Sequence, residues 1–210
     1  IIVDNNSKDR SHLCAKEYDG VKLISLKNNF GFAKACNIGA AESISDYFLF
    51  LNPDARLIKN TLKKVINFME SPNSKSNGIC GVQLLNDLGQ TSRSCSRFPT
   101  IYRHLFYAIG LSKLFPHLGS PMREWSHDED RKVDQLMGAF FFIRSQLFNT
   151  LGGFDERFFV YYEEVDLSYR AKLKGYDSIF LSNVQAFHLG GGSSDKVKAK
   201  RIFYSQRSHI

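Results

Sequence analysis

Short apolar runs alternate along the chain with stretches in which apolar residues recur every three or four positions. The runs that are typical of buried strands cover residues 1–3, 21–26, 47–51 and 79–85. The stretches with helical spacing cover residues 33–44 and 62–69, and the second has apolar side chains at i, i+3, i+4 and i+7. Strands that alternate with helices in this way predict an α/β layer around a parallel sheet.

The second half of the chain begins with a different pattern. Residues 93–118 are rich in aromatic and basic side chains, and Pro99 and Pro116 bracket a helical stretch within them. The pattern then predicts, in order, a polar loop, an apolar run, a helix and a last strand at residues 123–131, 133–143, 162–173 and 178–188. No linker or internal repeat divides these segments, so we expect one domain.

Length and composition narrow the class of protein. The chain has 210 residues, of which 43% are hydrophobic and 23% charged, as in an ordinary globular domain. No run of eighteen apolar residues occurs, which excludes a membrane-spanning helix in this stretch. Residues 1–3 follow no charged leader, so they look like a strand entered partway rather than a signal peptide. The 4 cysteines are far apart and form no CxxC pair, which indicates neither a zinc site nor a disulfide framework.

Basic residues are in excess. Lys and Arg number 28 and Asp and Glu number 21, which gives a net charge of +7. This excess favours anionic partners such as nucleic acid, phosphorylated small molecules or an acidic membrane surface, although plain solubility explains it equally well. The charge alone therefore selects no partner.

Two of the predicted strands end in acidic and amide side chains. The first runs into Asp4-Asn5 and the third into Asn52-Pro53-Asp54. Because side chains at the carboxyl ends of parallel strands face the ligand crevice, these residues are candidates to bind a ribose, a base or a metal. Turn formation is the alternative, since Asn, Asp and Pro are common turn residues.

A glycine-containing segment lies between these two strand ends. Gly31 permits a tight turn, and Asn29 is a candidate cap for the helix that follows. The N-terminus of that helix would face the same crevice and favour a diphosphate. The chain contains neither GxGxxG nor GxxxxGK[ST], which argues against a dinucleotide-binding Rossmann domain and against a P-loop.

The sharpest cluster of chemistry is Glu163-Glu164-Val165-Asp166. On a helix, Glu163, Asp166 and Arg170 share one face, so Asp166 can pair with Arg170 while Glu164 faces a cleft. The alternative is structural, because acidic residues in a first turn stabilise a helix through its macrodipole. His188, at the end of the last strand, is likewise a candidate metal or phosphate ligand or an ordinary structural histidine.

Taken in order, several segments resemble the inverting glycosyltransferases of family two, in particular their bacterial rhamnosyltransferase-like branch. The segments are VDNNSKD, NNFGFAKACNIG, FLFLNPDA, MGAFFFIR, GGFDERFFVYYEEVDLSYRAKLKGY and AFHLGGGS, and they span Ile1 to about Ser194. The resemblance implies an α/β fold of the GT-A type with a mixed, mostly parallel sheet flanked by helices. Within a single domain over 1–210 we expect a nucleotide-binding half at 1–90, an acceptor and catalytic half at 91–194, and the start of a C-terminal extension at 195–210.

The resemblance also implies a first strand that would precede Ile1 and whose Thr-Tyr-Asn-like turn would touch the nucleotide. We therefore expect the sheet to lack this inner strand. Each buried backbone group left unpaired costs ~1–3 kcal/mol, so the chain is expected to be poorly stable or inactive on its own.

The resemblance assigns roles to individual residues. The nucleotide pocket is implied to include Asp4, Asn5, Asn29, Gly31, Phe32, Asn37 and Asn52. Asn52-Pro53-Asp54 matches the family's DxD-like metal motif, with Asn52 in place of the first Asp, and Asp54 and His188 are the implied ligands of a divalent cation, Mg²⁺ or Mn²⁺. The catalytic group is implied to be Glu163, Glu164 and Asp166, with Glu164 as general base although it is one methylene longer than the Asp of the family.

The implied function is inverting transfer of rhamnose or a similar sugar from a nucleotide-diphosphate donor to a glycan acceptor, lipid-linked, in bacterial surface polysaccharide or cell wall synthesis. Such a protein would be cytoplasmic, at the inner face of the cytoplasmic membrane. Basic and apolar residues at 98–118 suit an amphipathic interfacial helix and peripheral membrane association, and packing of that helix on the domain is the alternative.

A second hypothesis comes from a different class of protein. The Glu at position 164 and the absent first strand suggest a non-catalytic nucleotide- or glycan-binding remnant of the same fold. A nucleic-acid binder lacks a matching motif, and nucleic acid is not expected as a partner.

Overall fold

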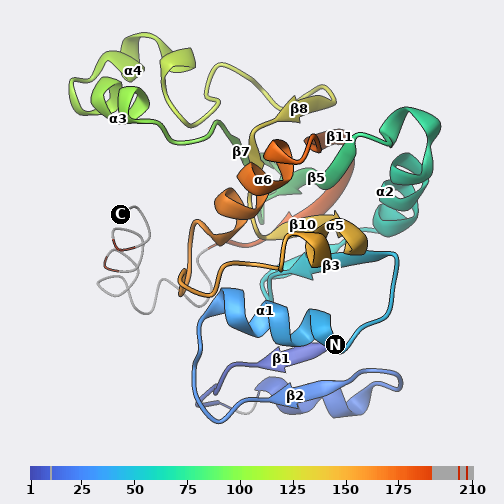
Figure 1. Ribbon diagram of the computed structural model, residues 1–210. Coiled ribbons are helices and arrows are strands. Elements are labelled where there is room, and N and C mark those ends of the chain that lie inside the picture. The colour runs from blue at the N-terminus through green and yellow to red at the C-terminus, as the bar shows by residue number, and fades with distance from the viewer. Residues whose placement is uncertain (10, 191–202, 204–206, 208–210) are drawn as a thin grey trace.

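The computed structural model describes every residue except 10, 191–202, 204–206 and 208–210 (Figure 1). Its strands are β1 (Ile2–Asp4), β2 (Leu23–Ser25), β3 (Tyr47–Leu51), β4 (Ala55–Leu57), β5 (Asn77–Leu85), β6 (Thr91–Ser92), β7 (Cys95–Ser96), β8 (Arg131–Val133), β9 (Gln135–Leu136), β10 (Phe140–Arg144) and β11 (Asp177–His188). Its α-helices are α1 (Phe32–Ala41), α2 (Thr61–Glu70), α3 (Ile101–Ala108), α4 (Leu111–Leu114), α5 (Ser145–Thr150) and α6 (Glu163–Leu173), and its 3₁₀ helices are η1 (Ser11–Glu17), η2 (Pro72–Ser74) and η3 (Pro116–Leu118).

The expected α/β layer is present, and its main sheet is mixed. Within the described residues the strand order is β3-β10-β5-β11-β4, with β6 on β5 and β8 on β11. Only β5 and β11 run parallel in this sheet, because β10 is antiparallel to both of its neighbours, β3 and β5, and β4 is antiparallel to β11. The expected majority of parallel pairs is therefore not found in it, since a reversed strand occupies its interior.

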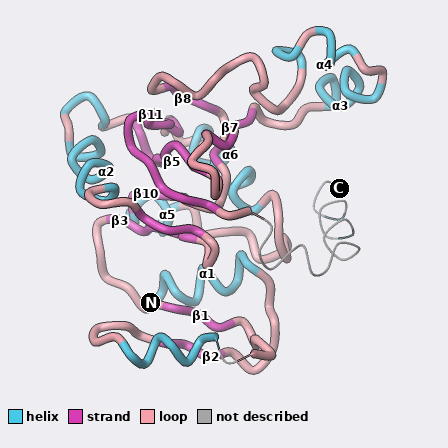
Figure 2. Tube along the Cα trace, turned by 180° about the vertical axis from the view of Figure 1, so that it is seen from behind, coloured by secondary structure: helices cyan, strands magenta, loops and turns pink. Residues whose placement is uncertain are grey.

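β1 and β2 form a second, two-stranded parallel sheet. Figures 1 and 2 show this pair at the bottom of the molecule, with α1 between it and the main sheet. Among the described strands, β1 pairs with β2 alone and β3 pairs with β10 alone. The expectation of an inner strand missing from this region stays a prediction, and the expected extension at 195–210 lies almost wholly outside the described residues.

β10 is apolar at successive positions because both faces of the sheet are covered. Phe141 and Ile143 belong to a buried cluster with residues of α1, α5 and α6, whereas Phe140 and Phe142 belong to a cluster with Val65 and Met69 of α2. A strand that is buried on both faces needs no period of two, which explains the unbroken FFFI run.

The register brings several strand ends to one edge of the sheet. Leu51, the last residue of β3, pairs with Phe140, the first of β10. Near the carboxyl ends of β5 and β11, Leu85 pairs with Phe187. The segments 52–55 and 138–139 and the end of β11 therefore lie along this edge, where most of the candidate chemistry in the second half of the chain is found.

None of the helices in the described part of the chain is long and apolar enough to cross a membrane.

Arg144, at the end of β10, is a hydrogen-bond donor to several parts of the fold. It donates to the carbonyl oxygens of Met69 at 2.7 Å, Ser74 at 3.2 Å and Asn77 at 3.0 Å, and to the hydroxyl of Tyr47 at 3.0 Å. One guanidinium thus ties the end of α2 and the segment before β5 to the edge of the sheet.

We predict that Arg144→Met lowers the free energy of unfolding by ~2–4 kcal/mol, because three backbone carbonyls would lose a charged donor at once. Urea unfolding of the two proteins measures the difference. The matched control, Lys63→Met, changes an exposed cation on α2 and should stay within ~0.5 kcal/mol of the wild type. Equal losses in both variants would contradict the role assigned to Arg144.

Candidate active site

The end of β1 is joined to the loop before α1 by one amide side chain. Asn5 donates through Nδ2 to the carbonyl oxygen of Gly31 at 2.9 Å and accepts through Oδ1 from the backbone N–H of Phe30 at 2.9 Å. Asn29 accepts the N–H of Gly31 at 3.0 Å, so it closes the turn instead of capping α1, whose N-cap is Gly31. The structure therefore brings Asn5, Asn29 and Gly31 together.

Asp4 is buried beside this loop. Its Oδ1 accepts from the N–H of Ser7 at 3.2 Å, and its Oδ2 lies 3.8 Å from Nδ1 of His12. The carboxylate therefore orders the turn after β1, which is the alternative that the sequence left open for this motif. A contact with a nucleotide stays a prediction for Asp4.

Gly31 is the point at which this loop meets the second half of the chain. Its φ of +88° is a conformation that L side chains rarely adopt, and a Cβ at this position would lie 2.3 Å from the carbonyl oxygen of Phe159. The next residue, Phe32, donates its N–H to the same oxygen at 2.6 Å. The loop before α1 thus packs directly against the segment that leads into α6.

Asn37, on α1, forms a second link to that segment. Its Nδ2 donates to the carbonyl oxygen of Phe154 at 2.8 Å, and its Oδ1 accepts from the N–H of Phe154 at 2.9 Å. The ring of Phe154 in turn packs among Phe50 and Phe148, with centroids 4.9 and 5.5 Å away. Both polar atoms of Asn37 are engaged in the fold, so its contacts indicate a positioning role rather than a free place in the nucleotide pocket.

The two implied metal ligands are brought together. Nε2 of His188 lies 3.4 Å from Oδ1 of Asp54, because β4 pairs with the end of β11 and the N–H of Leu189 donates to the carbonyl oxygen of Asp54 at 3.1 Å. A carboxylate and an imidazole are ligands that Mn²⁺ accepts, and phosphate oxygens commonly complete such a shell. The pair fits a divalent cation, although no cluster of three or more His, Cys, Asp or Glu residues occurs in the part of the chain that the structure describes.

Asn52 and the segment 138–139 connect this pair to the acidic cluster. The N–H of Asn52 donates to the carbonyl oxygen of Ala139 at 3.1 Å. Gly138, the next residue back, lies against Glu164, since a Cβ at Gly138 would be 3.9 Å from Cδ of Glu164. The Asn52-Pro53-Asp54 turn and the first turn of α6 therefore lie on either side of Gly138 and Ala139.

Glu163 and Glu164 open α6 and point to different surroundings. The side chain of Glu163 is buried, 5% exposed, and interacts electrostatically with Cys36 of α1, whereas Glu164 faces Gly138. In each carboxyl group one oxygen, Oε2, is buried without a hydrogen-bond partner. Two buried carboxyl groups side by side cannot both ionise at low cost, so the pair is poised to hold a proton.

The pKa values of the pair follow from this burial. Burial, and next the charge of Glu164, raise the pKa of Glu163 from its ordinary 4.5 to about 8. Burial also raises the pKa of Glu164, but backbone groups that include those of Tyr162 and Gly138 act in the opposite direction. The pKa values of both carboxyl groups are therefore raised, and the pair holds a proton more readily than two exposed glutamates would.

The backbone directly before these two glutamates has an unusual conformation. Tyr161 and Tyr162 both have positive φ values, 70° and 73°, and Tyr162 is the N-cap of α6. For non-glycine residues this conformation costs ~1–2 kcal/mol each, and such residues gather at functional sites when the surrounding structure holds them.

Asp166 lies one turn further along α6. It pairs with Arg170 as expected, with Oδ2 2.7 Å from Nε, and Arg170 also donates to the carbonyl oxygens of Leu151 at 2.7 Å and Gly153 at 2.9 Å. These contacts indicate that Asp166 orients an arginine that holds the loop after α5. A catalytic role for Asp166 stays a prediction.

Gly138, Ala139 and Cys36 are site residues to which no role was assigned from the sequence. Gly138 and Ala139 belong to the MGAFFFIR segment that carries the resemblance, and that was the available signal for them. The contact of Cys36 with Glu163 could not be predicted, because the spacing of apolar residues on a helix does not identify the side chains that pack against it.

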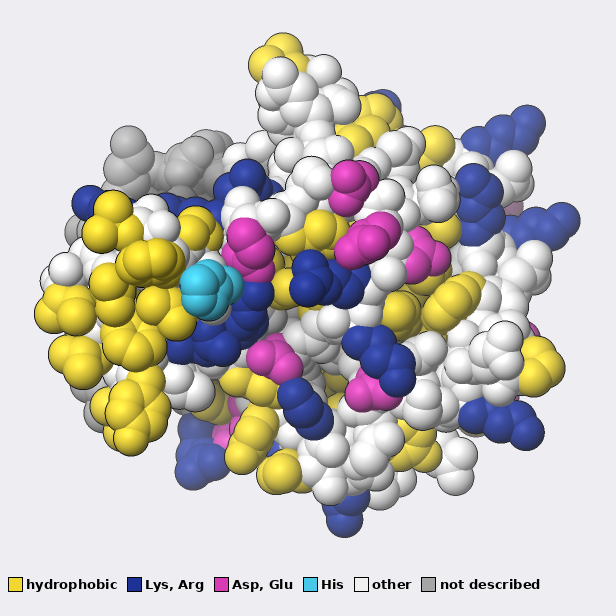
Figure 3. All heavy atoms as spheres, turned by 90° about the horizontal axis from the view of Figure 1, so that it is seen from above, with side chains coloured by type: hydrophobic (Ala, Val, Ile, Leu, Met, Phe, Trp, Pro, Cys, Tyr) yellow, Lys and Arg dark blue, Asp and Glu magenta, His cyan; other side chains and the backbone are white. Residues whose placement is uncertain are grey.

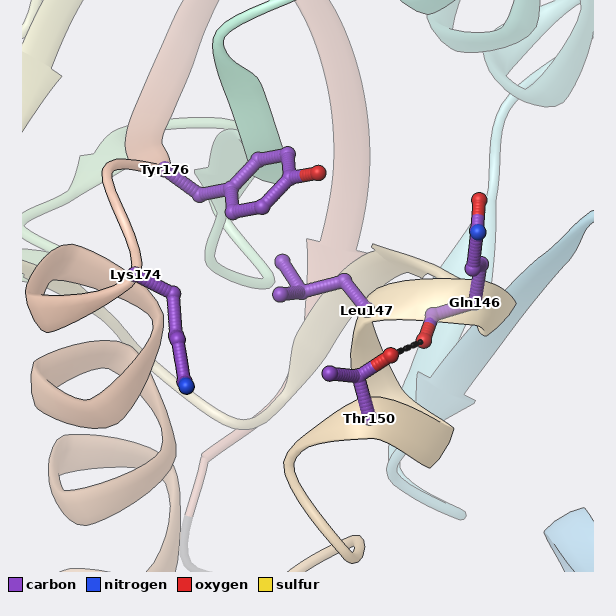
Figure 4. Close-up of a pocket in the computed structure, with 5 residues that line it drawn as sticks. All are labelled: Gln146, Leu147, Thr150, Lys174 and Tyr176. Carbon is purple, nitrogen blue, oxygen red and sulfur yellow. Dashed lines mark hydrogen bonds between the residues drawn. The ribbon is translucent and has the colours of Figure 1, made fainter.

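A small pocket of about 140 Å³ lies apart from these residues, between α5 and the turn after α6 (Figure 4). Its lining residues are Gln146, Leu147, Thr150, Lys174 and Tyr176. The hydroxyl of Thr150 is already engaged with the carbonyl oxygen of Gln146 at 2.7 Å. None of the candidate residues lines this pocket, so it is not part of the candidate site.

We predict that Gly31→Ala destabilises the fold more than Gly89→Ala. Both glycines have positive φ, but a Cβ at Gly89 meets nothing within 4 Å, whereas at Gly31 it would clash with the Phe159 backbone. Urea unfolding should show a loss of ~1 kcal/mol for Gly89→Ala and at least ~2 kcal/mol for Gly31→Ala. A Gly31→Ala loss no larger than that of Gly89→Ala would contradict the close approach.

We also predict a pH-dependent effect of Glu163→Gln. Because the pKa of Glu163 is raised to about 8, the stability from its proton is fully present below pH 4.5 and is lost as the pH rises through 8. The variant should therefore gain stability relative to the wild type between pH 5 and pH 8, measured by urea unfolding. Glu17→Gln, at an exposed site, is the control, and a Glu163→Gln difference that does not change with pH would contradict the assignment.

Comparison with known proteins places these observations in a family. The chain matches the family model of glycosyl transferase family 2 over residues 1–115. It is 24% identical over 224 residues to the N-acetylglucosaminyl-diphospho-decaprenol L-rhamnosyltransferase of Mycobacterium tuberculosis, covering 99% of this chain and 72% of that protein. It is 28% identical over 198 residues to rhamnosyltransferase WbbL of Escherichia coli strain K12, covering 90% of this chain and 70% of that protein.

Solved structures show the same fold. GalNAc-T7 with UDP, GalNAc and Mn²⁺ matches with a TM-score of 0.61 at 15% identity, over 89% of this chain and 36% of that chain. The mannosyltransferase PcManGT from Pyrobaculum calidifontis, in complex with GDP-Man and Mn²⁺, matches with a TM-score of 0.58 at 16% identity, over 91% and 48%. This chain thus spans less than half of each of these structures, and their likeness confirms the GT-A fold. Because the family match covers more than half of its length, the chain belongs to glycosyl transferase family 2.

Proposed function

We propose that this protein transfers rhamnose or a related sugar from a nucleotide-diphosphate donor to a lipid-linked glycan, with inversion at the anomeric carbon. The observation that carries the proposal is the position of Glu164. Its carboxyl group is buried at the start of α6 against Gly138, and Ala139 links that segment to the turn that bears Asp54. A base beside a diphosphate-binding strand end is what an inverting transfer requires.

The reaction uses a single displacement. The acceptor hydroxyl oxygen forms a bond to the anomeric carbon on the face opposite the diphosphate, while the bond between that carbon and the diphosphate oxygen breaks. Glu164 accepts the hydroxyl proton as the attack proceeds, and the diphosphate leaves with the electron pair of the broken bond. No covalent enzyme intermediate is needed, so one ionised carboxylate is sufficient.

Glu163 assists because its neighbouring carboxyl group, together with burial, raises the pKa of the pair. A raised pKa makes the ionised Glu164 a stronger base than an exposed glutamate. The extra methylene relative to the Asp of the family does not remove the carboxyl group from the site, since it lies against Gly138.

Asp54 and His188 are the residues that would hold a divalent cation, Mg²⁺ or Mn²⁺. When bound, such a cation neutralises negative charge on a diphosphate. The backbone N–H groups of Phe30, Gly31 and Phe32 are engaged within the fold, so the family resemblance, and not free backbone donors, supports a place for Asn29 and Gly31 on the donor side. The solved relatives named above contain UDP or GDP-Man together with Mn²⁺, which supports this assignment.

The names of two relatives support the proposed acceptor. The name of the mycobacterial relative describes a sugar joined through a diphosphate to decaprenol, and both relatives are named rhamnosyltransferases. We therefore propose a lipid-linked acceptor for this protein and a place at the inner face of the cytoplasmic membrane, in cell wall or surface polysaccharide synthesis.

We predict that Glu164→Gln loses at least ~100-fold in sugar transfer, because the amide cannot accept the proton, while donor binding is kept. Transfer by the full-length protein is measured as the nucleoside diphosphate that the reaction produces.

We predict that Asp54→Ala abolishes the Mn²⁺-dependent increase in melting temperature that the nucleotide sugar produces. The exposed-site variant Glu17→Gln is the control for both the transfer and the melting-temperature assays.

Two outcomes would contradict the proposal. Transfer that survives in Glu164→Gln would remove the base. Nucleotide-sugar binding without any transfer by the wild type would favour the alternative of a non-catalytic binding remnant.

A further inference from the structure

One part of the molecule is apolar but not buried. The helices α3 and α4 with η3 and their joining turns, residues 98–120 and here called the α3–α4 unit, project from one corner of the domain (Figure 1). No residue of either helix is buried. The large apolar side chains that it exposes, each by between 49% and 85%, are Ile101, Tyr102, Leu105, Tyr107, Ile109, Leu114 and Phe115.

The space-filling view shows that these side chains gather. Apolar atoms cover one end of the molecule in Figure 3, whereas elsewhere on that face they are scattered among charged groups. Monomeric soluble proteins rarely expose contiguous patches of this kind unless a partner covers them. The alternative that this segment packs its apolar face on the domain is not what the structure shows.

Polar contacts within the α3–α4 unit connect its parts to one another. Thr100 caps α3 by accepting from the N–H of Arg103 at 3.2 Å. Nη1 of Arg103 donates to the carbonyl oxygens of His117 at 3.2 Å and Gly119 at 2.9 Å. The exposed apolar residues are therefore available to a partner without loss of the local structure.

The charge of the surrounding sequence selects the kind of partner. Residues 88–123 contain no Asp or Glu, and their basic residues are Arg93, Arg97, Arg103, Lys113 and Arg123. Arg97 contacts Glu124 just beyond this range, which leaves the unit and its base net positive. Apolar side chains flanked by positive charge complement an anionic lipid surface, whereas two copies of the unit would bring like charges together.

The base of the unit is continuous with the acceptor side of the candidate site. β7, just before the unit, pairs with β9, and the N–H of Met137 donates to the carbonyl oxygen of Ser94 at 2.8 Å. The next residue is Gly138, which lies against Glu164. Phe98 also packs edge-on against Tyr169 of α6, with ring centroids 5.3 Å apart.

We propose that the α3–α4 unit binds the surface of an anionic membrane, with its exposed apolar side chains among the lipid headgroups. Docked in this way, the unit holds the acceptor side of the site at the membrane. That purpose rests on the proposed function, but the binding of lipid does not.

The experiment compares vesicle binding by the full-length protein and two variants. Ile109→Glu/Leu114→Glu places two charges in the patch, and Ile44→Glu changes a fully exposed isoleucine outside the α3–α4 unit. Flotation with phosphatidylcholine vesicles, with and without phosphatidylglycerol, measures binding. We expect the wild type and Ile44→Glu to bind the anionic vesicles alike and the double variant to bind at least ~10-fold more weakly.

Three results would overturn the proposal. They are absence of wild-type binding to anionic vesicles, equal binding by the wild type and the double variant, and a wild-type dimer that the double variant dissociates in sedimentation equilibrium. Hydrolysis of the nucleotide sugar by water is the separate readout for the proposed function. Hydrolysis without vesicle binding contradicts the docking surface alone, and vesicle binding without hydrolysis contradicts the transferase alone.

Discussion

The contact between Gly31 and Phe159 is the constraint on which the rest of the site depends. Residues far apart in the sequence meet there with no room for a single Cβ, and the carbonyl oxygen of Phe159 accepts the first N–H of α1. The loop before α1 and the acidic start of α6 are thereby set in one arrangement. Asn37 and Phe154 connect the same two parts at a second point, so polar contacts and an aromatic cluster fix the spacing between the loop and α6.

The fold gives the two glutamates different surroundings although they are neighbours in sequence and identical in chemistry. Glu163 faces the α1 side of the core and has little to solvate a charge, whereas Glu164 lies among backbone groups that favour one. Two tyrosines in left-handed conformation, Tyr161 and Tyr162, lead the chain into α6 directly before this pair.

Much of this could be predicted from the sequence, and the limits have physical causes. The apolar runs placed β3 without error and β11 and α6 to within one residue, because burial sets the period of these elements. The pairing of Asp166 with Arg170 followed from helix geometry. The direction of β10 did not follow, since an unbroken apolar run is compatible with either direction. The exposure of the α3–α4 unit could not be predicted either, because the apolar residues of a helix have the same spacing whether that face is buried in the domain or exposed.

The strand order has a consequence for how the chain is assembled. β3, β4 and β5 come from the first half of the sequence, yet β10 lies between β3 and β5, and β11 lies between β5 and β4. The first half therefore cannot close its sheet until the second half has been synthesised, and contacts of such long sequence separation make folding slow. The predicted boundary near residue 90 is therefore not a place where the chain divides into units that fold independently.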